Sequence, residues 1–227
     1  MSDVASRLQQ VRDRIAGACA RASRDPASVR LVAVSKTHSI EAVREAMAAG
    51  QSLFGENKVQ EALEKIAGLG PEARWHLVGH LQRNKAKHAA GAFELIHGID
   101  GRELALTLDR RSGERGTTQP VLVQANLAGE DTKHGADEAG LMPLLEAVAG
   151  LTHLDLRGLM IIPPVAGEPE RTRPWFRRLR ELRDRAAEHL SLPLPELSMG
   201  MTDDFEVAIE EGATLVRVGR AIFGERA

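Results

Sequence analysis

The hydrophobic positions along the chain follow two spacings in turn. Short unbroken apolar runs, such as Leu31–Val34, have the length and composition of strands that are buried on both faces. Between them lie segments in which apolar residues recur every three or four positions, as Leu8, Val11 and Ile15 do in a helix expected from about Val4 to Ala22. The pattern predicts strands at 31–34, 52–56, 75–80, 94–100, 120–127, 154–162, 194–200 and 214–219. Further helices are expected at 40–47, from about 57, from about 82, and at 102–112, 136–148, 170–189 and 204–210.

The regular order of strand and helix indicates the fold class. Eight near-continuous apolar strands that alternate with helices are typical of a parallel sheet covered on both faces. In a chain of 227 residues this order fits an α/β fold, a single (β/α)8 TIM barrel with an extra N-terminal helix, which forms one domain over residues 1–227. The alternative is an open Rossmann-like sheet, but no G-x-G-x-x-G motif follows the first strand.

Composition and charge narrow the classes of function. The net charge of −2 gives no electrostatic basis for binding nucleic acid or a membrane surface. No apolar run is long enough to span a bilayer, and the opening "MSDVASRLQQVRDRIAG" lacks the apolar core of a signal peptide. The single cysteine, Cys19, excludes an internal disulfide and suits a reducing compartment. We therefore expect a cytoplasmic protein without nucleic-acid or membrane partners.

Barrels of this kind carry their chemistry at the carboxyl ends of the strands, so the residues there are the candidate site. They are more polar than the strand interiors, and they include one lysine. The strand-end residues are Lys36, Glu56, Asn57, His80, His97, Asn126, Met160 to Pro163, Ser198 to Met201 and Arg217 to Arg220.

Lys36 is the most informative of these residues. An ordinary lysine has a pKa of about 10.4, so only roughly one in a few thousand is an uncharged nucleophile at pH 7. Burial at the mouth of an apolar barrel would lower that pKa and offer a free amine to a carbonyl group. The alternative is a lysine that points into water. The other five lysines, at 58, 65, 85, 87 and 133, fall on predicted helices or loops, where we expect solvated side chains.

The turns after the last two strands resemble a phosphate site. "LSMGMT" contributes the Ser198 hydroxyl and Gly200, and "RVGRAIFG" contributes the amides of Gly219 and Arg220. Asp203, with Glu206 three residues later, predicts a helix N-cap instead. Together with Lys36, these turns indicate a ligand that bears both an aldehyde and a phosphate.

Several motifs extend this picture over most of the chain. The stretches "LVAVSKTHS", "FGENKVQEA", "WHLVGHLQRNK", "GLMIIPP" and "LSMGMTDDFEVAIEEGATLVRVGRAIFG" run from the first strand to the C-terminus. As a set they resemble the YggS/PROSC family of pyridoxal phosphate homeostasis proteins, which bind pyridoxal 5′-phosphate (PLP). The chain departs from that family's pattern at two positions: His38 stands where many relatives have a second lysine, and Arg220 where many have threonine.

The resemblance implies a barrel like the N-terminal domain of alanine racemase and a role for each of eight residues. Lys36 would hold PLP as a Schiff base, and Asn57 would lie beside the ring. Ser198, Gly219 and Arg220 would hold the phosphate, although Arg220 in place of threonine removes a hydroxyl there. Arg217 would face the pyridine nitrogen or neutralise the phosphate, and Met160 and Met199 would line the pocket.

Two functions are compatible with such a site. An amino-acid racemase needs an acid/base on each face of the substrate, and in alanine racemases the second is a tyrosine. This sequence contains no tyrosine, and a histidine (His80 or His97) is the remaining candidate. An arginine opposite the pyridine nitrogen also weakens PLP as an electron sink. We therefore favour a PLP-binding protein that takes part in intracellular PLP homeostasis without catalytic turnover.

The partners expected are PLP and, for delivery, PLP-dependent apo-enzymes, and we expect a monomer. Lys133, in a polar loop after the fifth strand, is either a solvated lysine or one that handles PLP in transit. A third possibility is a docking surface on the helix "RTRPWFRRLRELRDRAAEHL", which has seven arginines between Arg171 and Arg185. Its apolar stripe of Trp175, Leu179, Leu182, Ala186 and Leu190 favours an ordinary barrel helix with a solvated outer face.

The sequence predicts no metal centre. His76 and His80 in "HLVGH" lie four positions apart on a predicted strand and would share a face. No third ligand follows at the spacing of a metal site, so we interpret both as structural or surface histidines.

Overall fold

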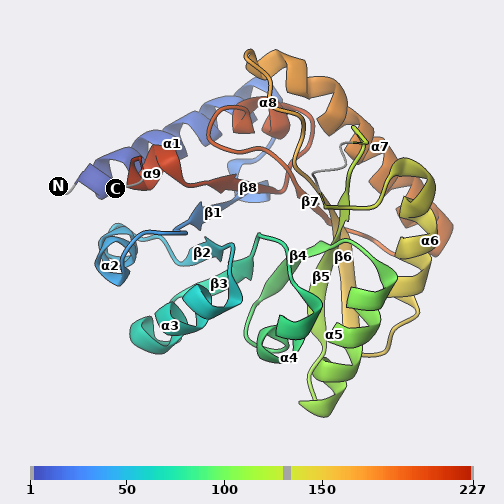
Figure 1. Cartoon of the computed structure of the whole chain (residues 1–227). Coiled ribbons are helices and arrows are strands. Elements are labelled where there is room, and N and C mark those ends of the chain that lie inside the picture. The colour runs from blue at the N-terminus through green and yellow to red at the C-terminus, as the bar shows by residue number, and fades with distance from the viewer. Residues whose placement is uncertain (1–2, 130–133, 226–227) are drawn as a thin grey trace.

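The fold is a closed barrel of parallel strands surrounded by helices (Figure 1). The structure is a computed structural model that describes residues 3–129 and 134–225. In these residues each strand pairs in parallel with the next one along the chain, and the last pairs with the first. The strands are β1 (Arg30–Val34), β2 (Leu53–Glu56), β3 (Arg74–Leu77), β4 (Leu95–Ile99), β5 (Gln119–Ala125), β6 (Leu154–Ile161), β7 (Glu196–Ser198) and β8 (Leu215–Val218). The predicted (β/α)8 barrel is confirmed.

The helices follow the predicted order, with differences at their ends. They are α1 (Asp3–Arg21), α2 (Ile40–Ala48), α3 (Val59–Leu69), α4 (Ala86–Ala89), α5 (Arg102–Glu114), α6 (Glu138–Ala149), α7 (Arg173–Leu190), α8 (Phe205–Glu210) and α9 (Arg220–Phe223). Three short 3-10 turns, at Pro26–Ser28, Arg83–Lys85 and Pro169–Thr172, precede β1, α4 and α7. The helix expected from about Gln82 is therefore a 3-10 turn followed by a single helical turn.

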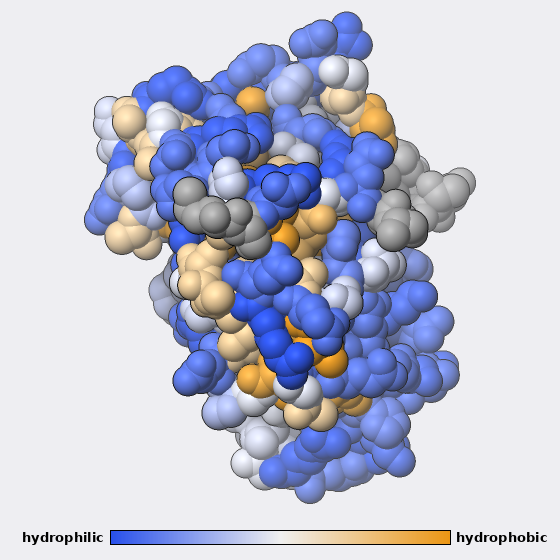
Figure 2. Space-filling model, turned by 90° about the vertical axis from the view of Figure 1, so that its left-hand side faces the viewer, coloured by the Kyte–Doolittle hydropathy of each residue, from blue (hydrophilic) through white to orange (hydrophobic). Residues whose placement is uncertain are grey.

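The extra N-terminal helix completes the helical layer. Because α9 is only four residues long, β8 is not followed by a full-length barrel helix. Helix α1 lies against α2, α8 and α9 and covers this side of the barrel (Figure 1). Its predicted stripe of Leu8, Val11 and Ile15 is buried there, and Arg14 and Arg21 pair with Glu206 on α8. From the side on which α1 and α9 lie, hydrophilic residues cover most of the surface and apolar ones gather in a central band (Figure 2).

Apolar side chains form two cores, one on each side of the strands. The larger lies between the strands and the helices. The smaller fills the barrel interior and consists of Val32, Val34, Leu53, Val78, Leu95, Leu122, Met160 and Leu215. This division follows from the alternation of side chains across a strand.

Helix α7 carries the arginine-rich segment, and ion pairs occupy much of its polar face. Arg173, Arg177 and Arg180 pair with Glu211, and Arg178 pairs with Glu138. Phe176 joins the predicted Leu179, Leu182 and Ala186 in the core, and the predicted Trp175 and Leu190 are partly buried and pack against it. The arginines of the polar face therefore pair with acidic residues of neighbouring elements, while the apolar face packs on the barrel. Among the described residues, no helix combines the length and the hydropathy that a bilayer crossing requires.

Candidate functional site

A cavity of about 770 Å³ opens at the carboxyl ends of the strands. Small-molecule sites usually have volumes of about 300–1,000 Å³, and barrels place their ligands at this end. Five of the eight predicted site residues line it: Lys36, Asn57, Arg217, Gly219 and Arg220. The other lining residues are Val34, His38, Val78, Gly79, His80, Gln124, His134, Ile162, Met201, Thr202, Asp203, Gly224 and Glu225.

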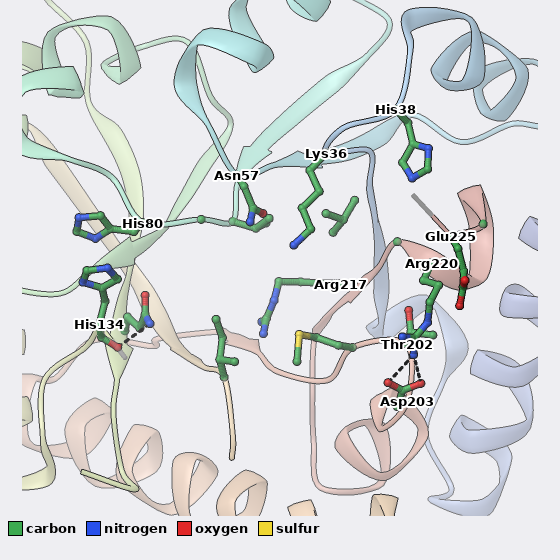
Figure 3. A pocket seen from close by; sticks show the side chains of 18 residues that line it. Lys36, His38, Asn57, His80, His134, Thr202, Asp203, Arg217, Arg220 and Glu225 are labelled. Atoms are coloured by element: carbon green, nitrogen blue, oxygen red, sulfur yellow. Dashed lines mark hydrogen bonds and ion pairs between the residues drawn. The ribbon is translucent and has the colours of Figure 1, made fainter. Parts of the chain in front are cut away.

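Lys36 projects into this cavity from the end of β1. Its side chain extends toward Arg217, with Asn57 beside it (Figure 3). A tight turn follows at once: the His38 N–H donates to the Ser35 carbonyl at 3.0 Å, and Thr37 has a φ of +66°. A positive φ is unusual for a β-branched residue and needs support from its surroundings. Here Glu61 accepts the Thr37 N–H at 2.6 Å, which fixes the turn that aims Lys36 inward.

A buried polar network joins the chain segments that carry Lys36 and Asn57. The ammonium group of Lys65 donates to the Ser35 carbonyl at 2.7 Å, to Glu56 Oε1 at 2.6 Å and to Glu61 Oε1 at 3.0 Å. The Ser35 hydroxyl also donates to Glu56 Oε1, at 2.7 Å. Ser35 and Glu56 are the residues immediately before Lys36 and Asn57, so the network holds both segments in register.

The expectation that Lys65 is solvated is wrong. Its side chain is 5% exposed and that of Glu56 is fully buried. An i, i+4 pair such as Glu61 and Lys65 is usually found on an exposed helix face. Here α3 turns that face toward the ends of β1 and β2. Burial raises the pKa of Glu56, while the hydrogen bonds from Lys65 and Ser35 oppose this effect.

Arg217 forms the floor of the cavity and is almost completely buried. It donates from Nη1 to Ser198 Oγ at 2.5 Å and from Nη2 to the Ile161 carbonyl at 2.9 Å. Burial lowers the pKa of Arg217 to about 10, so the guanidinium remains charged at neutral pH. This arginine therefore offers a fixed positive charge and hydrogen-bond donors from inside the barrel.

A chain of hydrogen bonds continues from Arg217 into the barrel, and its direction follows from the donors. The Ser198 hydroxyl accepts from Arg217, which only donates, and when it directs its own proton to His97 Nδ1, 2.8 Å away, each group from Arg217 to His97 has a partner. His97 then carries its proton on Nε2 and donates to His76 Nδ1 at 2.9 Å. This leaves the His76 proton on Nε2, which lies 3.6 Å from Glu94. Burial lowers the pKa of both histidines, which keeps them neutral.

Three predicted ligand-contacting residues lie outside the lining of the cavity. Ser198, Met160 and Met199 are fully buried. The Ser198 hydroxyl lies beneath Arg217, and Met160 belongs to the barrel interior. Met199 points away from the barrel, into the outer core, because successive strand residues face opposite sides.

The other candidate residues are divided between the cavity and the barrel interior. His97, expected at a strand end, lies in the middle of β4 and is completely buried, whereas His80 lines the cavity. The strand expected to include His80 ends earlier, at Leu77. Lys133 lies outside the described residues.

The end of the cavity away from His80 is formed by the turns after β7 and β8. Arg220 makes two hydrogen bonds to Asp203, at 2.6 and 2.7 Å (Figure 3). Asp203 is therefore not the predicted N-cap, a position that Asp204 occupies. A Cβ added at Gly219 would lie 2.9 Å from the Val34 carbonyl oxygen, so glycine allows the close approach of this turn to β1.

Sequence reasoning missed several lining residues, including Thr202 and His134. Thr202 is the last residue of the quoted turn "LSMGMT", and it offers a hydroxyl at the mouth, the group that Arg220 lacks. His134 follows β5, and its carbonyl accepts a hydrogen bond from Gln124 at 2.7 Å. No local pattern distinguishes either residue, because each reaches the cavity through a turn rather than a strand.

Comparisons with known proteins agree with this geometry. Residues 6–227 match the family model described as "Alanine racemase, N-terminal domain". The chain is 45% identical over 221 residues to the pyridoxal phosphate homeostasis protein of Aquifex aeolicus, which covers 97% of each chain. It is 41% identical to PipY of Synechococcus elongatus, a structure solved with PLP bound, with a TM-score of 0.86 over 97% of this chain and 100% of that one.

More distant structures share the barrel itself. Alanine racemase from Corynebacterium glutamicum is 18% identical, with a TM-score of 0.73 over 97% of this chain and 60% of that chain. At this identity the likeness concerns the fold alone. With a family model that spans nearly the whole sequence and relatives above 40% identity, the chain belongs to the family of the alanine racemase N-terminal domain.

Proposed function

We propose that this protein binds PLP in the cavity at the mouth of the barrel, holds it covalently through Lys36, and serves PLP homeostasis rather than catalysis. The observation that carries the proposal is the amine of Lys36, directed into a cavity of about 770 Å³ opposite the buried charge of Arg217. The relatives named as pyridoxal phosphate homeostasis proteins and the PLP-bound structure of PipY support the same assignment.

The residues present fit this cofactor. PLP supplies an aldehyde that bonds covalently to a lysine amine with loss of water. Its phosphate is an anion, and Arg217 and Arg220 provide positive charge on the lining. Gly219 and Thr202 also line the cavity, where a backbone amide and a hydroxyl can bind an anion. Asn57 lies beside Lys36, where an amide can orient a flat ring.

Ser198 supports the site from below. Its hydroxyl accepts from Arg217 and donates to His97, so it orients the guanidinium. Arg217, rather than Ser198, would then contact the ligand directly. For Met160 and Met199 the burial supports a packing role.

The arrangement of acid and base groups favours binding over turnover. If Arg217 faces the pyridine nitrogen rather than the phosphate, it cannot accept the hydrogen bond that keeps the ring protonated, and PLP is then a weak electron sink. The sequence has no tyrosine to act as a second acid/base. His97 is neutral, buried and committed to a hydrogen-bonded chain. Its position gives no support to the racemase alternative, and the activity assay below tests the other candidate base, His80, which lines the cavity.

The experiment combines a spectrum with an activity assay. The chain is mixed with PLP and freed of excess cofactor. We expect the purified protein to keep a visible absorbance that Lys36→Ala abolishes and that Lys58→Ala, a change at an exposed lysine, preserves. No retained absorbance in the unaltered chain would overturn PLP binding. Turnover of any common amino acid by the loaded protein would overturn the non-catalytic role.

Delivery of PLP to apo-enzymes and a monomeric state stay predictions. Light scattering during gel filtration tests the monomeric state. Delivery is tested by the rate at which an apo-enzyme acquires PLP, which should increase with the concentration of this protein.

A further inference from the structure

We propose that His80, Asp100 and His134 form a binding site for a divalent transition-metal ion, with Zn²⁺ the best fit, at the rim of the cavity. The three residues come from the segments that follow β3, β4 and β5, which are neighbouring strands of the barrel. One ligand atom from each lies within 4.8 Å of the other two. In Figure 3 the two histidines lie on the opposite side of Lys36 from the Arg220–Asp203 pair.

The separations match those of ligands that share one ion. His80 Nδ1 is 3.0 Å from Asp100 Oδ2, and His134 Nδ1 is 3.5 Å from the same oxygen. Two ligands at about 2.1 Å from a tetrahedral zinc ion are about 3.4 Å apart. The two observed distances to Asp100 lie on either side of this value, so the three ligand atoms are close enough to share an ion once the side chains turn toward it.

The two imidazoles stack on each other beside Asp100. Their ring centroids are 3.6 Å apart and the rings are nearly parallel, at 8°. Neutral rings can each donate from Nδ1 to the Asp100 carboxylate in this arrangement. To share an ion, which an imidazole binds in the plane of its ring, one ring has to turn out of the stack, and His134 is the more exposed of the two. A divalent ion lets both neutral rings and the carboxylate face one charge.

The ligand set selects the class of metal. Two imidazole nitrogens and one carboxylate suit zinc and the later first-row ions, whereas Mg²⁺ prefers oxygen ligands throughout. The side chains are accessible, with exposed fractions of 33% for His80, 17% for Asp100 and 55% for His134. Because both histidines line the cavity, the remaining coordination positions would be open to water or to a polar group of a bound ligand.

The spacing of residues in metal-binding sequence motifs does not predict this site. His76 and His80 share the local motif, but His76 is buried inside the barrel with His97, and only His80 reaches the rim. The partners of His80 follow other strands, 20 and 54 positions further along the chain.

The test is a titration of the full, untagged chain with ZnCl2 at pH 7.5 in competition with a chromophoric chelator, with and without PLP. We expect one equivalent to bind, and His80→Ala and His134→Ala each to weaken it by at least about tenfold. The matched control is His189→Ala, which removes an exposed histidine paired with Glu146 on the outer helices. It should leave zinc affinity unchanged.

Two further readouts make the result decisive. Co²⁺ bound at the site should give the intense visible bands of a low-symmetry site with nitrogen ligands, and these should vanish in His80→Ala. Circular dichroism should show that each variant folds as the parent does. The proposal is overturned if the parent binds no zinc in competition, or if the equivalent that it binds persists in both His80→Ala and His134→Ala. Because the zinc readout does not need PLP, failure here is distinguishable from failure of the proposed function.

Discussion

Replacement of Lys65 by methionine tests whether the buried network beneath the site is a structural requirement. The substitution keeps most of the aliphatic stem and removes the ammonium group that bonds to Ser35, Glu56 and Glu61. Glu56 would then keep only the Ser35 hydroxyl as a partner for its Oε1 atom. Its other oxygen is already buried without a hydrogen bond among the described residues.

The expected loss in the free energy of unfolding follows from the burial of the Lys65–Glu56 ion pair. Removal of one partner from a buried ion pair costs about 3–5 kcal/mol, because the remaining charge is left uncompensated. A domain of this size has a free energy of unfolding of about 5–15 kcal/mol, so the loss is a large fraction of the total. Replacement of both charges, in the double variant Glu56→Gln with Lys65→Met, should recover much of the loss.

The loss of stability in Lys65→Met should depend on pH. Because burial raises the pKa of Glu56 in the folded protein, the stability associated with this group is greatest below the ordinary pKa of glutamate and is lost as the pH rises through the folded-state value. Without Lys65 the opposing hydrogen bond disappears and the pKa rises further. The deficit of Lys65→Met should therefore be larger at pH 8 than at pH 5.

The assay is urea unfolding followed by the fluorescence of the tryptophans, of which Trp75 is buried, at the two pH values. The control is Lys58→Met, at an exposed lysine immediately before α3. It should change stability by no more than about 1 kcal/mol. A loss below about 1 kcal/mol for Lys65→Met at pH 8 would contradict the reasoning, because that is the cost of a solvated lysine.

Two other changes probe the frame of the site. Ser198→Ala leaves two buried groups without their shared hydroxyl and should cost about 1–3 kcal/mol in urea unfolding, together with a loss of PLP affinity. Its control, Ser112→Ala, removes a buried hydroxyl with no partner among the described residues, and an equal loss there would refute the argument. Gly79→Ala places a Cβ 2.4 Å from the Asn57 carbonyl oxygen and should weaken PLP binding by displacing that segment. Gly101→Ala meets no atom within 4 Å and should bind as the parent does, whereas equal binding by both variants would contradict this prediction.

The fold was predictable because its signals are local. Alternating apolar runs and helical stripes give the barrel directly, and the end of the first run places Lys36 at the mouth. The short α9 and the role of α1 in filling the gap beside it depend on packing between the chain's two ends, which the pattern does not encode. Strand and helix ends moved by a few residues where turns such as the one at Gly79 intervene.

The site was predictable only in part, because several of its residues are defined by tertiary contacts. Lys36, Asn57 and Arg217 are among the strand-end residues that position predicts, and the family resemblance singles out Asn57 and Arg217 from the rest. Lys65 sits on a helix face that looks solvated in sequence, and only the packing of α3 against β1 and β2 reveals its burial. His97 looked like a strand-end residue, but the register of β4 places it in the interior.

The arrangement of charges is compatible with the proposed role in PLP homeostasis. Lys36 faces a fixed donor, Arg217, whose own environment is closed by Ser198 and the Ile161 carbonyl. The histidines beneath are neutral and hydrogen-bonded to each other. Proton transfer at a bound ligand would therefore depend on Lys36 and the other groups on the cavity lining, such as His80, since the inner histidines are neutral and bonded to each other.

The most direct test of the central claim is to identify the lysine to which PLP bonds. The protein is incubated with PLP, reduced with borohydride to make the bond permanent, digested and examined by mass spectrometry. The account predicts a pyridoxyl group on the peptide that contains Lys36 and its loss in Lys36→Ala. A pyridoxyl group found instead on another lysine, or on none, would contradict it.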